Sequence, residues 1–178
     1  MAQNPSNTAS EQNIKTLFSV MNSILHIIES LISQEELLDS YESNLDSIMS
    51  ACQFILSQEY PRFAQVPPEI IKARGKVVSL VHLYSFKFGE FFRGHMDPMF
   101  QSIWNAIESN KGQATKQCEK LVRSTVKYMG EITLMPSKHA FIKMNLMKIF
   151  DLLILPNISI TEDDHNEYED DADAYIRN

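Results

Sequence analysis

The densest group of residues that could do chemistry lies near the C-terminus. Eight carboxylates and no lysine or arginine stand between residues 162 and 173, and they are Glu162, Asp163, Asp164, Glu167, Glu169, Asp170, Asp171 and Asp173. Such a group could hold a calcium ion, bind a basic partner or form a solvated acidic linker. The segment has no oxygen ligands in the EF-hand spacing and no central glycine, which excludes that calcium site. A basic partner and a solvated linker remain as the two interpretations.

Sequence motifs of catalysis, nucleotide binding and metal binding are absent. The sequence contains no G-x-x-x-x-G-K-[ST], G-x-G-x-x-G, G-x-S-x-G, H-E-x-x-H or C-x-x-C. The five histidines are scattered along the chain and build no metal face. We therefore expect a protein that is not an enzyme, with no catalytic residue, no cofactor and no metal site.

The net charge of -7 arises entirely in the C-terminal tail, because residues 1–161 hold 15 Lys/Arg and 15 Asp/Glu. The cluster of Lys72, Arg74 and Lys76 is too small for a groove that follows a phosphate backbone. We expect no nucleic acid partner.

The composition indicates a helical globular protein in a reducing compartment. Hydrophobic residues make up 44% of the chain, and only 5 glycines and 7 prolines are present, few for sheets joined by tight turns. Cys52 and Cys118 lie in apolar periodic segments, which is typical of small buried side chains rather than of a disulfide framework. The first ten residues do not form a secretory signal, and no apolar stretch reaches the roughly 20 residues that cross a bilayer, so we expect no membrane insertion.

Apolar residues at steps of three and four predict six helices that would position these groups. Their approximate ranges are 10–34, 38–56, 69–92, 97–110, 113–134 and 138–155. Ser10 is the expected N-cap of the first helix, and Pro67-Pro68 is expected to begin the third. Trp104 is expected to be buried between the third and fourth helices. The sixth helix is apolar on most of its circumference, which predicts burial between neighbours, one of them beyond these six helices.

The helices are expected to pair into three antiparallel hairpins that begin near residues 10, 67 and 113. The resulting spacings approach the ~40–47 residues of HEAT-type repeats. We therefore predict an all-α fold, an α-solenoid of helical hairpins of the HEAT or armadillo kind over residues 10–160. A closed six-helix bundle is the alternative. Residues 1–9 are expected to be a flexible N-terminus, and residues 161–178 an acidic insertion followed by the start of a further helix.

Several segments resemble the importin-β superfamily of nuclear transport receptors, the karyopherins, and most of all its Cse/CAS branch. The resemblance is carried by Tyr41–Met49, by His82–Phe88 with Phe91, by Met99–Asn105, by Leu155-Pro156-Asn157, and by the acidic run that ends in Tyr175-Ile176-Arg177. Ala172, Asn178 and Ser43 depart from the family pattern. The pieces keep the family's order and spacing over about residues 38–178.

The resemblance implies a segment of a nuclear export receptor that binds importin-α cooperatively with Ran-GTP and carries it from nucleus to cytoplasm. It implies nuclear pore proteins as further partners. It also implies that residues 162–177, including Tyr175, Ile176 and Arg177, are the insertion that contacts cargo and Ran, and charge repulsion within it predicts a flexible segment in the isolated chain. An import receptor of the same superfamily and an unrelated helical scaffold or enzyme are the alternatives.

Overall fold

The computed structural model describes residues 5–34, 39–59, 66–109, 115–158 and 162–172. These residues form helices and no strand, which confirms the predicted all-α class. The helices are α1 (Pro5–Ile32), α2 (Asp39–Glu42), α3 (Leu45–Ser57), α4 (Pro68–Lys87), α5 (Gly89–Phe92), α6 (Met96–Ser109), α7 (Thr115–Thr133), α8 (His139–Ile149), α9 (Leu155–Ile158) and α10 (Glu162–Asp170). Two short 3-10 turns, η1 (Arg93–His95) and η2 (Pro136–Lys138), precede α6 and α8, and the π-helical segment η3 (Phe150–Ile154) joins α8 to α9.

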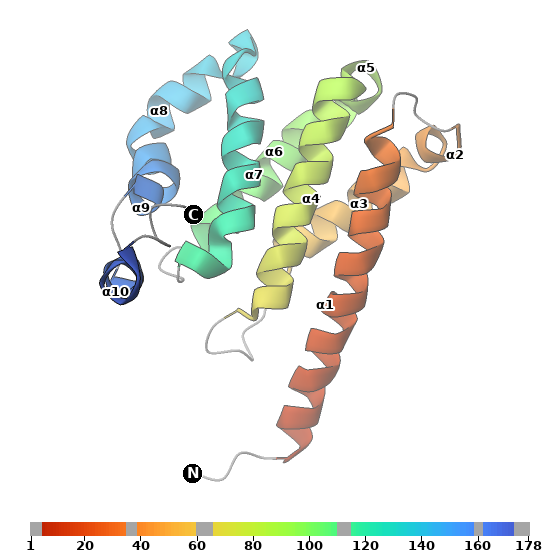
Figure 1. Cartoon of the computed structure of the whole chain (residues 1–178). Coiled ribbons are helices and arrows are strands. Elements are labelled where there is room, and N and C mark those ends of the chain that lie inside the picture. The colour runs from red at the N-terminus through yellow and green to blue at the C-terminus, as the bar shows by residue number, and fades with distance from the viewer. Residues whose placement is uncertain (1–4, 35–38, 60–65, 110–114, 159–161, 173–178) are drawn as a thin grey trace.

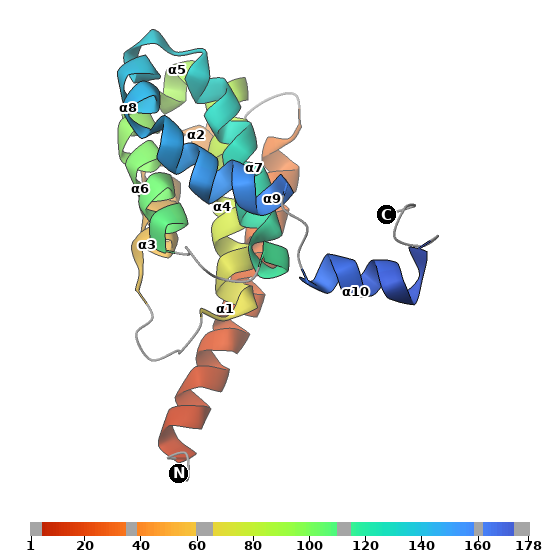
Figure 2. The same cartoon turned by 90° about the vertical axis from the view of Figure 1, so that its left-hand side faces the viewer.

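The helices form two layers of an open solenoid. In one layer α1, α4 and α7 lie side by side and run in the same direction (Figure 1). Behind them α3 and α6 pack together and run the opposite way, and each also contacts α4 (Figure 2). Because α1 and α8 lie at opposite edges of the array (Figure 1), the chain is a solenoid rather than a closed bundle.

The core is centred on α4, which has neighbours on several sides. Its fully buried apolar side chains are Ile70, Ile71, Ala73, Val77, Val78, Leu80, Val81 and Tyr84. A helix that is apolar over most of its circumference must be covered by several neighbours, and α1, α3, α6 and α7 supply that cover. α4 is therefore the helix around which α1, α3, α6 and α7 pack.

Gly75 brings α4 unusually close to α7. A Cβ atom at this position would lie 2.8 Å from the backbone nitrogen of Leu121 and 3.0 Å from the carbonyl carbon of Lys120. Only glycine, which has no Cβ, allows two helix backbones to approach in this way. The close contact couples the two helices as one rigid pair.

Both ends of the solenoid expose apolar side chains. On α1 the exposed residues follow helical spacing and are Leu17, Val20, Ile24, Ile27 and Leu31. At the other end the exposed residues are Met144, Leu146, Met147, Phe150, Ile154, Leu155 and Ile158. Such end surfaces are expected where a repeat array continues, since each repeat contacts only its neighbours. Within the described residues the sixth predicted helix is covered on one side only, and its exposed apolar face agrees with the prediction of a further neighbour beyond the six helices.

Several predicted helix boundaries are wrong. α1 begins at Pro5, a suitable first-turn residue, so Ser10 lies inside the helix and is not its N-cap. The expected second helix is divided at Ser43–Asn44, and the expected third helix ends at Lys87 because Phe88 leaves helical geometry with φ -128° and ψ 40°. Apolar periodicity continues across such short breaks, which is why it did not reveal them. Of the predicted flexible N-terminus, residues 5–9 belong to α1, and residues 1–4 lie outside the described residues.

Trp104 is buried as predicted, with 5% of its surface exposed. Its aromatic partner, however, is Phe141 on α8, in an edge-to-face contact with ring centroids 5.3 Å apart. Phe100 meets the same ring at 4.7 Å. The prediction placed Trp104 between the third and fourth helices and left out its contact with the sixth. In the structure these aromatic contacts join α6 to α8.

Candidate interaction sites

The acidic segment forms the helix α10, which projects from the side of the α1, α4 and α7 layer (Figure 2). The first three residues of α10 are Glu162, Asp163 and Asp164, and acidic residues at a helix start favour helix formation because the helix dipole is positive there. His165 Nε2 lies 3.3 Å from Glu169 Oε1 one turn later. The acidic start of the helix and the His165–Glu169 contact both favour a helix here. The sequence had predicted a flexible insertion because the carboxylates repel one another.

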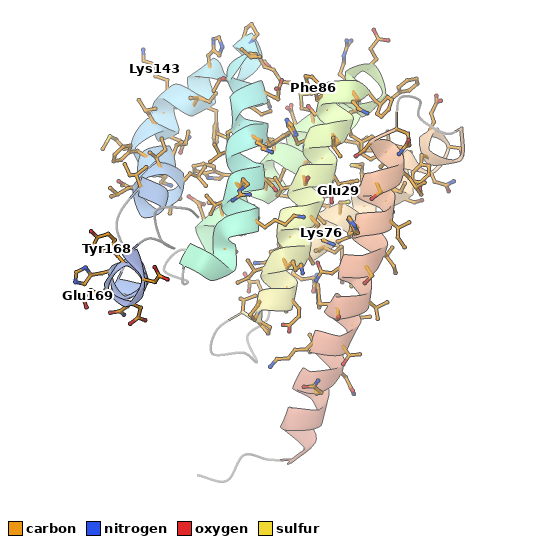
Figure 3. The ribbon with its side chains drawn as sticks, in the orientation of Figure 1. Glu29, Lys76, Phe86, Lys143, Tyr168 and Glu169 are labelled. Carbon is orange, nitrogen blue, oxygen red and sulfur yellow. The ribbon has the colours of Figure 1, made fainter. Side chains whose placement is uncertain are left out.

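The described side chains of this segment face solvent. Tyr168 is 50% exposed, and Glu169, Asp170 and Asp171 are exposed as well. Figure 3 shows Tyr168 and Glu169 on α10 at the edge of the molecule that carries α8. Asp173, Tyr175, Ile176 and Arg177 lie outside the described residues, and for Glu162, Asp163, Asp164 and Glu167 only the helical backbone is described.

A chain of polar contacts crosses the face of the α1, α4 and α7 layer. Lys76 on α4 is 8% exposed, and its Nζ donates to the backbone oxygen of Asn22 on α1 at 2.5 Å. Burial, followed by the charges of Lys120 and Lys72, lowers the pKa of Lys76. Glu29 on α1 lies near Lys76 between the two helices (Figure 3). The buried lysine therefore links α4 to α1 through this hydrogen bond.

Glu29 extends this chain of contacts to α7. Ser79 Oγ on α4 donates to Glu29 Oε1 at 2.5 Å, and Lys120 Nζ on α7 lies 4.0 Å from Glu29 Oε2. One carboxylate from α1 thus meets groups from both other helices of the layer. The contact lies on the face opposite α3 and α6, because those helices cover the other side of α4.

A pocket of about 330 Å³ opens between α4 and α7 beside Glu29. Its lining residues are Ser79, His82, Lys120, Arg123, Ser124 and Lys127, and we call it the basic pocket. The lining holds three cationic side chains and no carboxylate. Burial is the main cause that lowers the pKa of His82; the carboxylate of Glu131 opposes this shift, and the nearby Lys127 adds to it.

Sequence reasoning missed the basic pocket and considered a different cluster. Arg74 and Lys76 of that cluster point into the packing, where Arg74 Nη2 donates to the backbone oxygen of Gln58 at 2.6 Å. The signal that could have revealed the pocket is the spacing of Lys120, Arg123 and Lys127, which places three cations on one face of α7.

A second hollow, of about 480 Å³, lies between α1 and α3 and is almost wholly apolar. Its lining includes Met21, Ile24, Ile28, Ile48 and Ile55. The two helices of the first predicted hairpin are therefore splayed rather than closely packed.

Both cysteines are buried, free thiols, as predicted. Burial raises the pKa of Cys52 to about 12 and raises that of Cys118 as well. A thiol that stays protonated is a poor nucleophile and metal ligand. Among the described residues no group of three His, Cys, Asp or Glu side chains could hold a metal ion, and none of the described helices is long and apolar enough to cross a membrane.

One family model and several known proteins match this chain. The family model described as Cse1 matches residues 1–178. The "Importin alpha re-exporter" of Saccharomyces cerevisiae is 26% identical over 110 residues, which cover 61% of this chain and 11% of that protein. "Exportin-2" of Oreochromis niloticus is 31% identical and "Exportin-2" of Homo sapiens 29% identical, each over 97 residues, which cover 53% of this chain and 10% of the relative.

The fold has a close counterpart among solved structures. The structure described as "The exportin Cse1 in its cargo-free, cytoplasmic state" superposes with a TM-score of 0.78 and 22% identity, over 96% of this chain and 19% of that one. This likeness confirms the solenoid architecture. The matched region spans about a tenth of the length of the curated relatives.

Proposed function

The chain belongs to the Cse1 family of exportin-type nuclear transport receptors, and on that premise we propose that it is a segment of a receptor that binds importin-α together with Ran-GTP. The family match over residues 1–178 is the observation that carries the proposal. The name of the yeast relative, "Importin alpha re-exporter", supports importin-α as the cargo. A receptor of this kind shuttles between nucleus and cytoplasm and contacts nuclear pore proteins on the way.

The two apolar ends support a segment that works inside a longer solenoid. The exposed stripe on α1 and the exposed apolar residues of α8, η3 and α9 would be covered by preceding and following repeats. In such a superhelix small changes between neighbouring repeats add up along the array. Partners that bind at separate places on it can then alter one another's affinity, and this coupling is reciprocal.

The acidic helix α10 is the proposed contact with a basic surface of Ran or importin-α. Its described carboxylates are exposed, and the helix stands off the layer that carries α1, α4 and α7 (Figure 2). Charge complementarity of this kind mainly raises the association rate, and it weakens as salt screens the charges. The proposed contact extends through Tyr175, Ile176 and Arg177. A solvated linker, the other interpretation of the acidic segment, would lack this effect.

The test replaces six carboxylates by their amides in a receptor of the relatives' length that contains this chain. These residues are Glu162, Asp163, Asp164, Glu169, Asp170 and Asp171. Stopped-flow association with Ran-GTP and importin-α at low salt should slow by about tenfold or more, because electrostatic steering contributes factors of that order. A variant with Glu42→Gln and Glu90→Gln, two exposed carboxylates on α2 and α5, is the control and should associate nearly as fast as the wild type.

Unchanged association kinetics in the six-residue variant would assign the segment to the solvated linker. Whether Ran-GTP strengthens or weakens importin-α binding is tested separately, by pull-down of importin-α with Ran loaded with GTP or GDP. Ran-GTP should increase capture of importin-α by an export receptor. Release of importin-α by Ran-GTP would instead indicate an import receptor.

A further inference from the structure

The basic pocket between α4 and α7 has a chemistry that the proposed contact through α10 does not use. Lys120, Arg123 and Lys127 lie along one face of α7, and Ser79 and His82 complete the wall from α4. The charge of this wall is opposite to that of α10. The pocket therefore fits a ligand of negative charge.

The structure already shows how this wall holds a carboxylate. Glu29 accepts a hydrogen bond from Ser79 Oγ at 2.5 Å, and its second oxygen lies 4.0 Å from Lys120 Nζ. Glu29 contacts Ser79 and Lys120 but is not among the residues that line the pocket. Lys127 stands seven residues after Lys120, about 10 Å further along the helix axis at 1.5 Å per residue.

The dimensions favour a peptide over a larger ligand. Side chains on one face of an extended peptide recur every two residues, at about 7 Å, so two such side chains span about 7 Å and three about 14 Å, which bracket the roughly 10 Å between Lys120 and Lys127. A volume of about 330 Å³ admits a few side chains. Three cations on a chain of net charge -7 are too few to follow a nucleic acid backbone.

The pocket is also preorganised. Gly75 holds the α4 and α7 backbones in direct contact, and Ser124 and Leu121 on the α7 side are buried. The helix backbones are therefore already in place, and only the exposed Lys and Arg side chains must be ordered when a ligand binds. We propose that the basic pocket binds a carboxylate-rich peptide segment of a partner protein, a role independent of the function proposed for α10.

The experiment measures binding of a fluorescein-labelled (Glu-Ser)6 peptide to the 178-residue chain by fluorescence anisotropy at low salt. Saturable binding is expected, and the matched (Gln-Ser)6 peptide should not bind. The double variant Lys120→Gln/Lys127→Gln should bind about two- to thirtyfold more weakly, since each exposed charge pair contributes about 0.2–1 kcal/mol. The variant Lys120→Arg/Lys127→Arg keeps both charges and should keep binding within about threefold.

The control removes two lysines elsewhere. Lys143→Gln/Lys148→Gln removes two exposed lysines of α8, of which Lys148 lies 3.1 Å from Glu108 Oε1; it changes the net charge equally and should weaken binding less than twofold. Circular dichroism and thermal midpoints check that every variant folds. Absence of saturable binding, equal loss in the α8 variant, or undiminished binding in the Lys120 and Lys127 variant would each overturn the proposal.

A competition arm separates peptide recognition from general anion binding. Inorganic phosphate is compared with chloride at equal ionic strength, and both should displace the peptide to a similar degree through screening. Strong displacement by phosphate alone would show a phosphate site and overturn the assignment to a carboxylate-rich peptide.

Discussion

Replacement of Gly75 by alanine tests the close approach of α4 and α7 directly. The added Cβ would lie 2.8 Å from Leu121 N, 3.0 Å from Lys120 C and 3.1 Å from Leu121 Cα. All three atoms belong to the α7 backbone, so no side-chain rotation relieves the contact. α4 cannot retreat without cost, because α1, α3 and α6 also pack against it. The two helices must therefore move apart.

Two opposing contributions determine how Gly75→Ala changes the free energy of unfolding. Alanine stabilises a helix interior by about 1 kcal/mol relative to glycine. Overpacking a tightly packed contact costs about 1–3 kcal/mol, and here the contact involves backbone. The expected result for Gly75→Ala is no gain in stability and a loss of up to about 2 kcal/mol.

Gly130, on the exposed surface of α7, provides the matched control. A Cβ at this position would meet nothing within 4 Å, so Gly130→Ala should stabilise the chain by up to about 1 kcal/mol. The difference between the two variants then measures the steric cost at the α4–α7 contact, about 1–3 kcal/mol. Urea unfolding followed by circular dichroism reports both values. If Gly75→Ala stabilises the chain as much as Gly130→Ala does, the argument for a glycine-dependent contact is refuted.

Three other predictions concern the core, a buried thiol and an open end. Trp104→Ala should cost about 3–5 kcal/mol of unfolding free energy, the usual range for a large buried aromatic, and an unchanged urea midpoint would contradict its packing on Phe141. Because burial raises the pKa of Cys52 from 9.0 to about 12, the folded state keeps a proton that the unfolded state loses, so stability should fall as pH rises above 9. Urea midpoints between pH 9 and 10 should fall less in Cys52→Ala, and equal slopes would show that this thiol contributes nothing. Ile27→Ser, on the exposed stripe of α1, should reduce self-association in sedimentation experiments at nearly constant stability. Leu25→Ser should instead cost about 2–5 kcal/mol of unfolding free energy, because Leu25 is only 6% exposed. A wild-type chain that stays monomeric at about 100 μM would contradict the role of the stripe.

The sequence by itself determined the class of fold and most of the helices. Apolar residues at steps of three and four marked each long helix, and Pro67-Pro68 marked the start of α4. Motif order over residues 38–178 indicated the receptor family, which the match over the whole chain confirms. The acidic segment was evident from composition, because eight carboxylates without a cation need no structure to be noticed.

Only the tertiary structure decided which groups meet. The basic pocket joins Ser79 on α4 to Lys127 on α7, and the aromatic contact joins Trp104 on α6 to Phe141 on α8. The same holds for the burial of Lys76 and for Gly75, whose lack of a side chain matters only beside Leu121. Periodicity defines the apolar face of a helix, but the partner of that face depends on packing between segments far apart in the chain, which local residue patterns do not encode.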